Sequence, residues 1–243
     1  MKIGVLLAPE IEEDGIGYYD RKIFELLKNT NFDETNEVVG ITVGKSSDDA
    51  PICEGLARGL DRGVLLVDNN YENSNCYSVS NSIASYISKV EKFDLIICGY
   101  KSHSSGSSMV PVLISNCLNY VTALDVISID VTNYPNILFK SNHHGIIETI
   151  RTKVPTIICC ENHKANINPV GLKDIMMAFD MEVKKVHLDT FNSVKTEENN
   201  YPIGKLIGTF KINQKRKNTI FDQAGMREFG KEIKELIIKT ARS

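Results

Sequence analysis

Small hydroxyl side chains gather in one short stretch of this sequence. Residues 102–108, SHSSGSS, hold five serines and one glycine, and they follow the apolar run Leu95–Cys98. Serine hydroxyls and a glycine let phosphate oxygens come close to the backbone, and a helix that begins near residues 107–110 would add its N-terminal N–H groups. The stretch therefore predicts a phosphate-binding loop. Serine and glycine also cap helices and build turns without any ligand, so a plain turn is the alternative.

Other chemically active residues do not suggest a catalytic site. His143 and His144 precede Gly145 at an expected hairpin turn, and no third metal ligand stands at a useful spacing. The six cysteines form no CxxC pair and lie mostly in apolar surroundings, which is typical of buried free thiols. No nucleophile, base and orienting group occur together in a recognisable pattern. We therefore expect no catalysis by the chain's own side chains.

Composition limits the class of protein. With 243 residues, of which 42% are hydrophobic, the chain is long enough for one large α/β domain or for a domain with an appendage. The net charge of −3 gives no electrostatic footprint for nucleic acid. No apolar run reaches the roughly 18 residues of a membrane helix, and the N-terminal apolar stretch is too short for a signal peptide. We expect no nucleic-acid partner, no membrane insertion and a cytoplasmic location.

Short runs rich in valine, isoleucine and leucine alternate with segments of helical spacing. Unbroken apolar runs suit strands that are covered on both faces, as in a parallel sheet. The expected strands are Ile3–Leu7, Val38–Val43, Val64–Val67, Leu95–Cys98 and Thr156–Cys160. Between the first four lie apolar residues at helical spacing, within residues 23–27, 52–60 and 79–90. The alternation predicts an α/β fold with a doubly wound, mostly parallel sheet.

The pattern changes after the fourth expected strand. Residues 121–131 alternate between apolar and polar types, residues 133–136 (NYPN) form a turn signal, and residues 137–154 read as two more strands around Gly145. These features predict an antiparallel meander before the strand at Thr156.

The C-terminal part of the sequence differs from the rest. Beyond Asp189 the chain becomes polar and then basic, and it ends in an expected helix from about Gln223 to Thr240. An apolar stripe on that helix must pack on something, either its own domain or a partner. We predict an α/β domain at 1–188 and a linker with a C-terminal helical arm at 189–243. The stripe consists of Met226, Phe229, Ile233, Leu236 and Ile237.

Several segments, in one order along the chain, resemble the β subunit of electron transfer flavoproteins. Residues 55–68 (GLARGLDRGVLLVD) are similar to that family's passage from a helix into a strand. Residues 93–99 (FDLIICG), the serine loop and residues 110–129 resemble its next strand, nucleotide loop, helix and strand. Residues 140–158 (KSNHHGIIETIRTKVPTII) are similar to its signature region, and residues 166–178 (NINPVGLKDIMMA) to its N-E-P-R segment with the following helix. Residues 215–237 resemble its C-terminal tail.

This resemblance implies a fold, cofactors and partners. The fold would be of the Rossmann-like, adenine-nucleotide-binding type. The chain would pair with an α subunit that carries most of an FAD site, and the arm would pack on that partner. The pair would carry electrons from flavin-dependent dehydrogenases to a downstream acceptor, so the chain would be an electron carrier rather than an enzyme. The β subunit's own pocket would hold AMP or, in electron-bifurcating members, a second FAD.

The resemblance also implies which residues surround the nucleotide. They follow the ends of the first, second and fourth expected strands or begin the next helix. The positions that match the family's pocket are Ala8, Pro9, Tyr19, Asp20, Val43, Gly44, Gly99, Ser102, Ser104, Ser105, Gly106, Ser107, Ser108, Met109 and Val110.

The sequence also departs from the family's pattern. Ser104, Ser107 and Met109 stand where the family commonly has Asp, Thr and Gln. Asn168 and Val170 replace the Glu and Arg of N-E-P-R, and a lost arginine removes a cation that could pair with a flavin or the other subunit. Two alternatives therefore stay open: a stand-alone adenine-nucleotide-binding module, and a divergent subunit that has lost its nucleotide.

Overall fold

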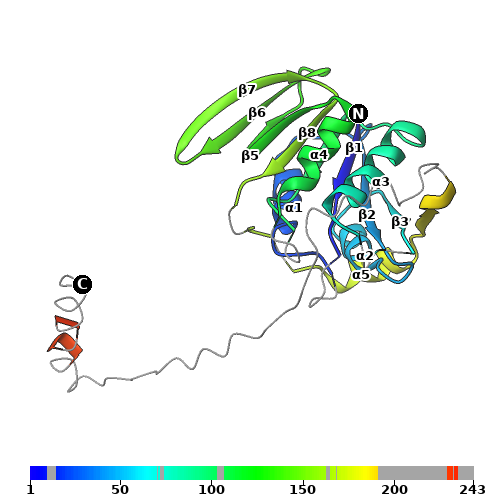
Figure 1. Cartoon of the computed structure of the whole chain (residues 1–243), viewed down its shortest axis with the longest axis horizontal. Helices are drawn as coiled ribbons and strands as arrows, with labels where there is room; N and C mark the ends of the chain where they lie inside the picture. The colour runs from blue at the N-terminus through cyan, green and yellow to red at the C-terminus, as the bar shows by residue number, and fades with distance from the viewer. Residues whose placement is uncertain are drawn as a thin grey trace. The chain divides into compact units, whose positions relative to one another are not determined.

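The structure, a computed structural model, divides the chain into two compact units, Met1–Tyr201 and Pro202–Ser243. It describes residues 1–9, 15–69, 71, 74–102, 107–162, 165–167, 169–190, 229–231, 233 and 234. In the first unit the described residues form a nine-stranded sheet with helices (Figure 1). None of the described helices has the length and apolar character that crossing a membrane requires.

The strands follow the order β7-β6-β5-β8-β4-β1-β2-β3-β9 across the sheet. Across the sheet from β5 through β8, β4, β1, β2 and β3 to β9, each strand pairs in parallel with the next. Strand β6 pairs antiparallel with both β5 and β7. The prediction of a mostly parallel α/β sheet with an antiparallel part is thereby confirmed. The strands are β1 (Lys2–Leu6), β2 (Glu37–Gly44), β3 (Arg62–Val67), β4 (Leu95–Cys98), β5 (Val121–Asp130), β6 (Asn136–His143), β7 (Ile146–Lys153), β8 (Thr156–Cys160) and β9 (Val183–His187).

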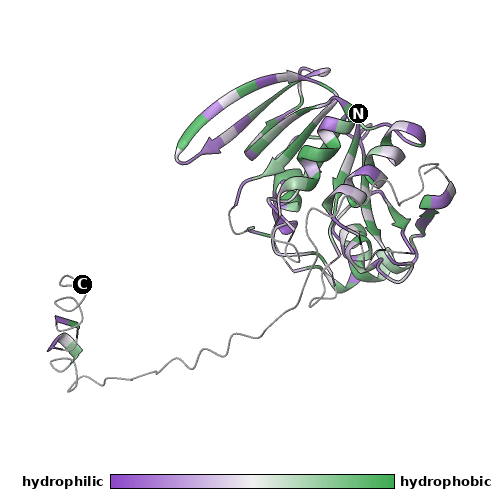
Figure 2. Cartoon of the chain, viewed as in Figure 1, coloured by the Kyte–Doolittle hydropathy of each residue, from purple (hydrophilic) through white to green (hydrophobic). Residues whose placement is uncertain are grey.

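Helices cover both faces of the parallel part of the sheet. On one face, Ile3, Val5 and Leu95 pack with the buried side chains of α1 and α2. On the other face, Val39 and Ile96 pack with those of α3 and α4. Side chains of neighbouring strand residues point to opposite faces, so an unbroken apolar run supplies both cores. The central strands are largely green in Figure 2. The helices are α1 (Arg21–Asn29), α2 (Ala50–Ala57), α3 (Cys76–Lys89), α4 (Met109–Leu118) and α5 (Leu172–Phe179).

The meander of β5, β6 and β7 matches the sequence pattern. The β6–β7 hairpin pairs Asn136 with Lys153 through His143 with Ile146 without a break in register. Its turn places His144 and Gly145 at positive φ, as a two-residue hairpin turn requires. The β5 strand is irregular. Asp125 has a φ of 53° where the register shifts against β8, and the register against β6 shifts between Val126 and Ser128. The Nε2 atom of His143 lies 3.0 Å from the Ser141 hydroxyl, and its Nδ1 atom lies 3.5 Å from Asp125 Oδ2.

The sequence pattern missed the edge strand β9. Its sequence, VKKVH, holds only two apolar residues and is mostly exposed, so it lacks the apolar run that marked the central strands. It nevertheless pairs in parallel with β3, from Gly63 with Val183 to Val67 with His187. The η2 turn (Leu188–Thr190) follows it.

Helix α5 differs from the other helices in its surface. It packs against α2 through a small buried residue, Ala178. Its large apolar side chains remain exposed, with Leu172 at 74%, Met176 at 63% and Phe179 at 85%. An apolar helix surface of this kind is typical of contact with another protein.

The second unit is described only in part. Residues 229–231, 233 and 234 are helical, within the helix that the sequence predicts for about 223–240. The other residues of that expected helix lie outside the described residues. Packing of the arm on a partner stays a prediction.

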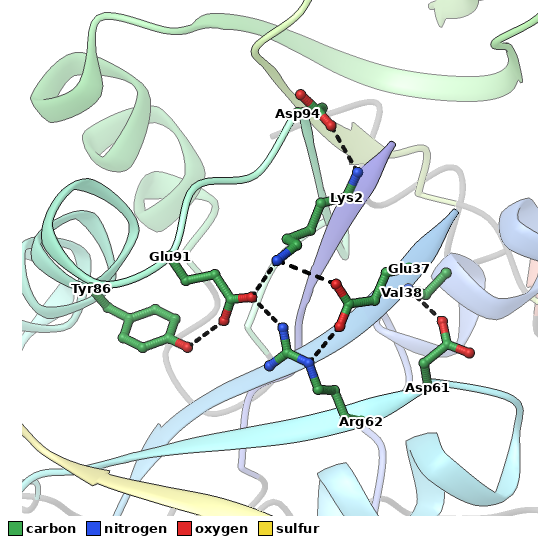
Figure 3. Close-up of polar contacts among 8 residues, drawn as sticks. All are labelled: Lys2, Glu37, Val38, Asp61, Arg62, Tyr86, Glu91 and Asp94. Carbon is green, nitrogen blue, oxygen red and sulfur yellow. Dashed lines mark hydrogen bonds and ion pairs between the residues drawn. The ribbon is translucent and has the colours of Figure 1, made fainter. Parts of the chain in front are cut away.

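A network of charged residues joins three strands at the amino-terminal edge of the sheet (Figure 3). The Lys2 ammonium on β1 lies 2.8 Å from Glu91 and 3.3 Å from Glu37, which is on β2. The Arg62 guanidinium on β3 pairs with the same two carboxylates. The Tyr86 hydroxyl donates a 2.8 Å hydrogen bond to the second Glu91 oxygen. Glu91 therefore receives donors from three side chains while its own side chain is 15% exposed.

These contacts set the protonation of Glu91. Burial alone would raise its pKa, but hydrogen bonds from Lys2, Arg62 and Tyr86 outweigh burial and lower the pKa to about 2. The pKa of Tyr86 moves the other way, raised by burial and by its bond to Glu91. The Glu91 carboxyl is thus ionised in the folded chain at pH values where it would be protonated in the unfolded chain.

We predict that Glu91→Gln lowers the free energy of unfolding by about 3 kcal/mol at pH 7, because the folded pKa lies below an unfolded value of about 4.3. A lowered folded pKa gives stability that is complete above about pH 5 and is lost as the pH falls toward about 2. The difference between wild type and variant should shrink to about half by pH 3. Urea unfolding at pH 7 and pH 3 measures it.

The control for this prediction is Glu148→Gln, which removes an exposed carboxylate on β7. It should change stability by less than about 0.5 kcal/mol at either pH. A pH-independent difference for Glu91→Gln would contradict the pairing.

Candidate functional site

A cavity of about 720 Å³ opens at the carboxyl-terminal edge of the sheet, beyond the ends of β1, β2 and β4. Along the chain, β1, β2 and β3 extend the sheet in one direction, and α3 then returns the chain to β4 on the other side of β1. In open parallel sheets ligands bind in the crevice at such a reversal. The cavity is lined by the strand residues Leu6, Ile41, Val43 and Cys98, and by Leu7, which directly follows β1.

Three chain segments meet closely at this reversal. Asp20 precedes α1, but its side chain does not cap that helix. Its Oδ2 instead accepts a 2.9 Å hydrogen bond from the backbone N–H of Ala8, just after β1. Gly99, just after β4, lies so close that an added Cβ would stand 2.1 Å from Asp20 Oδ1 and 3.0 Å from the Tyr19 carbonyl. Only a glycine fits at position 99 without a shift of its neighbours.

Two helices begin at the cavity with uncharged caps. At the start of α3, Asn75 Oδ1 accepts hydrogen bonds of 3.0 Å from the backbone N–H groups of Tyr77 and Ser78. At the start of α4, Ser107 Oγ accepts one from Met109 N–H at 3.1 Å. Asn75, Ser107 and Ser108 all line the cavity. The positive ends of two helix dipoles therefore lie at the cavity without a carboxylate at either cap, and this arrangement favours an anion.

The other two helices that start at this edge have acidic N-caps. Asp20 precedes α1 and Asp49 precedes α2. Asp48, which lines the cavity, accepts the Lys45 backbone N–H at 2.8 Å and the Ser47 hydroxyl at 3.1 Å. Burial, and then the charges of Asp48 and Asp68, raise the pKa of Tyr71, so the hydroxyl of this lining residue stays protonated. The cavity thus offers carboxylate acceptors as well as helix N-termini.

The two described ends of the serine loop are held together. The Ser102 backbone N–H donates to the Ser107 carbonyl at 3.1 Å. The Ser108 hydroxyl donates to the Tyr100 carbonyl at 2.8 Å. The hydroxyls of Ser107 and Ser108 therefore both take part in the loop's own structure, one as a helix cap and one as a cross-link. Capping and turn formation, the alternative that the sequence left open, accounts for these two contacts.

The structure brings most of the described candidate residues together. Those that line the cavity are Ala8, Pro9, Asp20, Val43, Gly99, Ser102, Ser107, Ser108 and Val110. Tyr19, Gly44 and Met109 are next to lining residues but do not line the cavity themselves. Ser104, Ser105 and Gly106 lie outside the described residues. None of these positions is shown to bind a nucleotide, so their binding role stays a prediction.

Several polar lining residues were missed by the sequence reasoning. They are Lys45, Ser47, Asp48, Tyr71, Ser74, Asn75, Tyr100 and Lys101. A signal did exist for Asn75, because an asparagine before the apolar spacing of α3 is typical of a helix N-cap. Lys101 stands one residue before the serine loop, but nothing local in the sequence shows that its side chain reaches a cavity.

The cavity is suited to binding rather than to catalysis. Burial raises the pKa of the Cys98 thiol, as do its contact with Cys159 and its charged surroundings, so this lining residue is a poor nucleophile. Among the described residues, no group of three histidine, cysteine or acidic side chains could hold a metal ion. Apolar strand ends, carboxylate acceptors and helix N-termini together fit a ligand that has an apolar ring, hydroxyl groups and an anionic group.

Comparison with known proteins identifies the family. The electron transfer flavoprotein domain matches residues 26–190. The chain is 23% identical to the electron transfer flavoprotein subunit beta of Bacillus subtilis, over 98% of this chain and 93% of the relative. It is 24% identical to the caffeyl-CoA reductase-Etf complex subunit CarD of Acetobacterium woodii, over 60% and 56%. It is 21% identical to the subunit beta of Thermoanaerobacterium thermosaccharolyticum, over 76% and 71%. The chain therefore belongs to the electron transfer flavoprotein β-subunit family.

Proposed function

We propose that this chain pairs with an α subunit and that the pair carries electrons from flavin-dependent dehydrogenases to a downstream acceptor. Membership of the family supports the electron-transfer role, and the names of two relatives mark them as subunits of larger assemblies. Phe229 and Ile233 in the second unit are 40% and 39% exposed, which is consistent with an arm that packs on another chain. The redox chemistry would come from an FAD shared with the α subunit.

We further propose that the cavity holds an adenine nucleotide, either AMP or a second FAD, in the manner of a Rossmann-like fold. The observation that carries this proposal is that the neutrally capped starts of α3 and α4 line the same cavity as the ends of β1 and β2. A phosphate would bind at the helix starts, where the dipoles favour negative charge. Ribose hydroxyls would donate to carboxylates such as Asp48, and the adenine ring would contact apolar side chains such as Val43 and Ile83.

The chain's own contribution to electron transfer would be structural. When bound, flavin accepts and donates the electrons, and the side chains of this chain hold cofactor and partner at fixed positions. Rigid placement matters because the elements around the cavity come from four different helix starts and three strand ends. A nucleotide in the cavity would link these elements to one another and so stabilise the folded chain by mass action.

The surface of α5 is the contact region that we propose for the dehydrogenases. It exposes Leu172, Met176, Met177 and Phe179. Methionine side chains are flexible and polarisable, so a methionine-rich surface can adapt to partners of different shape. Such a surface suits a carrier that accepts electrons from more than one dehydrogenase.

The first prediction concerns the cofactors. The purified chain, heat-denatured alone and after co-expression with an α subunit, should release an adenine nucleotide, which mass spectrometry and visible absorption identify. AMP with one FAD per heterodimer indicates an ordinary carrier, and two FAD indicate electron bifurcation. Release of neither nucleotide nor flavin from either preparation would refute the proposed cofactors and favour the divergent subunit.

The second prediction concerns Gly99. Gly99→Ala should lower nucleotide retention by at least about fivefold, because the added Cβ pushes Asp20 and the Tyr19 backbone out of place at the cavity. The amount of nucleotide released per chain measures the effect. Gly171→Ala is the matched control, because its Cβ meets only the flexible end of Asp174 at 3.0 Å, outside the cavity. Equal retention by both variants would contradict a ligand at the end of β4.

The third prediction concerns α5. Replacing Met176 and Phe179 with serine should leave the unfolding temperature within about 2 °C of wild type, since both side chains are exposed. The same double variant should weaken binding to a flavin-dependent dehydrogenase by about tenfold or more. Electron transfer from the dehydrogenase at varied carrier concentration measures this. An unchanged concentration dependence would exclude α5 from the contact.

A further inference from the structure

Lys101 lines the cavity and has no carboxylate partner among the residues that the structure describes. Its Nζ lies 5.0 Å from the ring centroid of Tyr19 and 6.0 Å from that of Tyr100. These two rings lie 6.0 Å apart and are tilted by 50°. Ring faces attract an ammonium group electrostatically without using its N–H donors as a carboxylate would. The cation is thus held in place while it can still donate to a ligand.

Two other cations that are largely covered by the fold, Lys22 and Arg58, are paired with nearby carboxylates. Lys22 lies 3.1 Å from Glu25 and 3.5 Å from Glu161. Arg58 pairs with Glu54 at 2.6 Å. Water solvates the exposed lysines on the surface, whereas Lys101 is half-buried at the cavity. A half-buried ammonium over two rings, with no carboxylate partner in the part of the chain that the structure describes, is suited to an anion from a ligand.

The position of Lys101 is fixed relative to the start of α4. The Ser108 hydroxyl holds the carbonyl of Tyr100, the residue before Lys101, at 2.8 Å. On the other side, the Ser102 N–H donates to the Ser107 carbonyl at 3.1 Å. The residues on either side of Lys101 are therefore both bonded to the two serines that directly precede α4. Its charge and the helix dipole act on the same part of the cavity.

The serine hydroxyls cannot supply the positive charge that a phosphate group would need. Ser107 Oγ caps α4 and Ser108 Oγ donates to the chain itself. A hydroxyl is neutral, so even a serine that reaches the ligand does not balance a phosphate dianion, whereas a lysine ammonium does.

We propose that Lys101 recognises the phosphate of the nucleotide in the cavity and makes the cavity selective for the nucleotide over the uncharged nucleoside. This inference rests on the proposed nucleotide-binding function and assigns its specificity to one side chain. The tyrosine rings hold the ammonium until phosphate binds, and the helix starts of α3 and α4 complete the anion site.

The test uses the full-length chain, freed of copurified nucleotide by dialysis, with AMP and adenosine as probes in calorimetric titrations. Lys101→Met should weaken AMP binding by about 10- to 100-fold and leave adenosine binding within about twofold, because a charge-assisted hydrogen bond is lost only for AMP. Lys101→Arg should restore most of the AMP affinity. Lys140→Met is the control, since Lys140 is an exposed lysine on β6 that does not line the cavity. It should keep the AMP preference.

The outcomes separate this inference from the proposed function. If wild type prefers AMP to adenosine and Lys101→Met keeps that preference, the backbone alone binds phosphate and the inference is wrong. An equal loss of both ligands in Lys101→Met and Lys101→Arg also overturns it, because Lys101 would then maintain the shape of the cavity. If wild type binds neither probe, the nucleotide pocket itself is refuted, and the inference fails with it.

Discussion

The carboxylate of Asp20 is the contact on which the carboxyl-terminal edge of the sheet depends. It binds the N–H of Ala8 after β1 and fills the space that Gly99 leaves after β4. Because Asp20 also precedes α1, this one side chain fixes a strand end, a helix start and the neighbouring strand end together. Glu54 on α2 adds a second link, since its Oε2 accepts the Ile16 N–H at 2.7 Å in the segment before α1. These contacts hold the crevice open at the reversal between β1 and β4.

The two edges of the sheet differ in how their charged groups are paired. At the amino edge, Lys2, Arg62 and two glutamates neutralise one another across three strands. Partners of opposite charge that are fixed in place offer little to an incoming ion. At the carboxyl edge, uncharged caps on α3 and α4 leave the helix dipoles unbalanced. Lys101 adds a charge that lies over aromatic rings and has no carboxylate partner among the described residues. The strands β8, β4, β1, β2 and β3 of the central sheet run in parallel. Their carboxyl ends, and the starts of the helices that follow them, therefore lie at this one edge.

The features that the sequence could predict are those marked by a pattern of neighbouring residues, and contacts between distant residues leave no such pattern. Strands such as β4 and β8 are buried on both faces, so every residue in them is apolar and the run is evident. The edge strand β9 pairs with one neighbouring strand only, and two adjacent lysines separate its two valines, so no apolar run marks it. The family resemblance placed Gly99 and Asp20 near the ligand, but their mutual contact spans 79 positions and no local pattern reports it. Lys101 was missed for the same reason, because its partner ring at Tyr19 is distant in the sequence.

The net negative charge of the chain means that an anion site would depend on the groups placed at the cavity, namely the uncharged caps of α3 and α4 and the ammonium of Lys101. A net charge of −3 gives no general attraction for a nucleotide, which is itself an anion. At physiological ionic strength, charges act over only about 8 Å, so affinity for the proposed phosphate would have to come from groups at the cavity itself. Carboxylates at the caps of α3 and α4 would cancel the dipoles within that distance. Neutral caps at these two helices, together with the Lys101 ammonium, which has no carboxylate partner in the described part of the chain, are the groups that would draw the proposed anion into the cavity of an acidic protein.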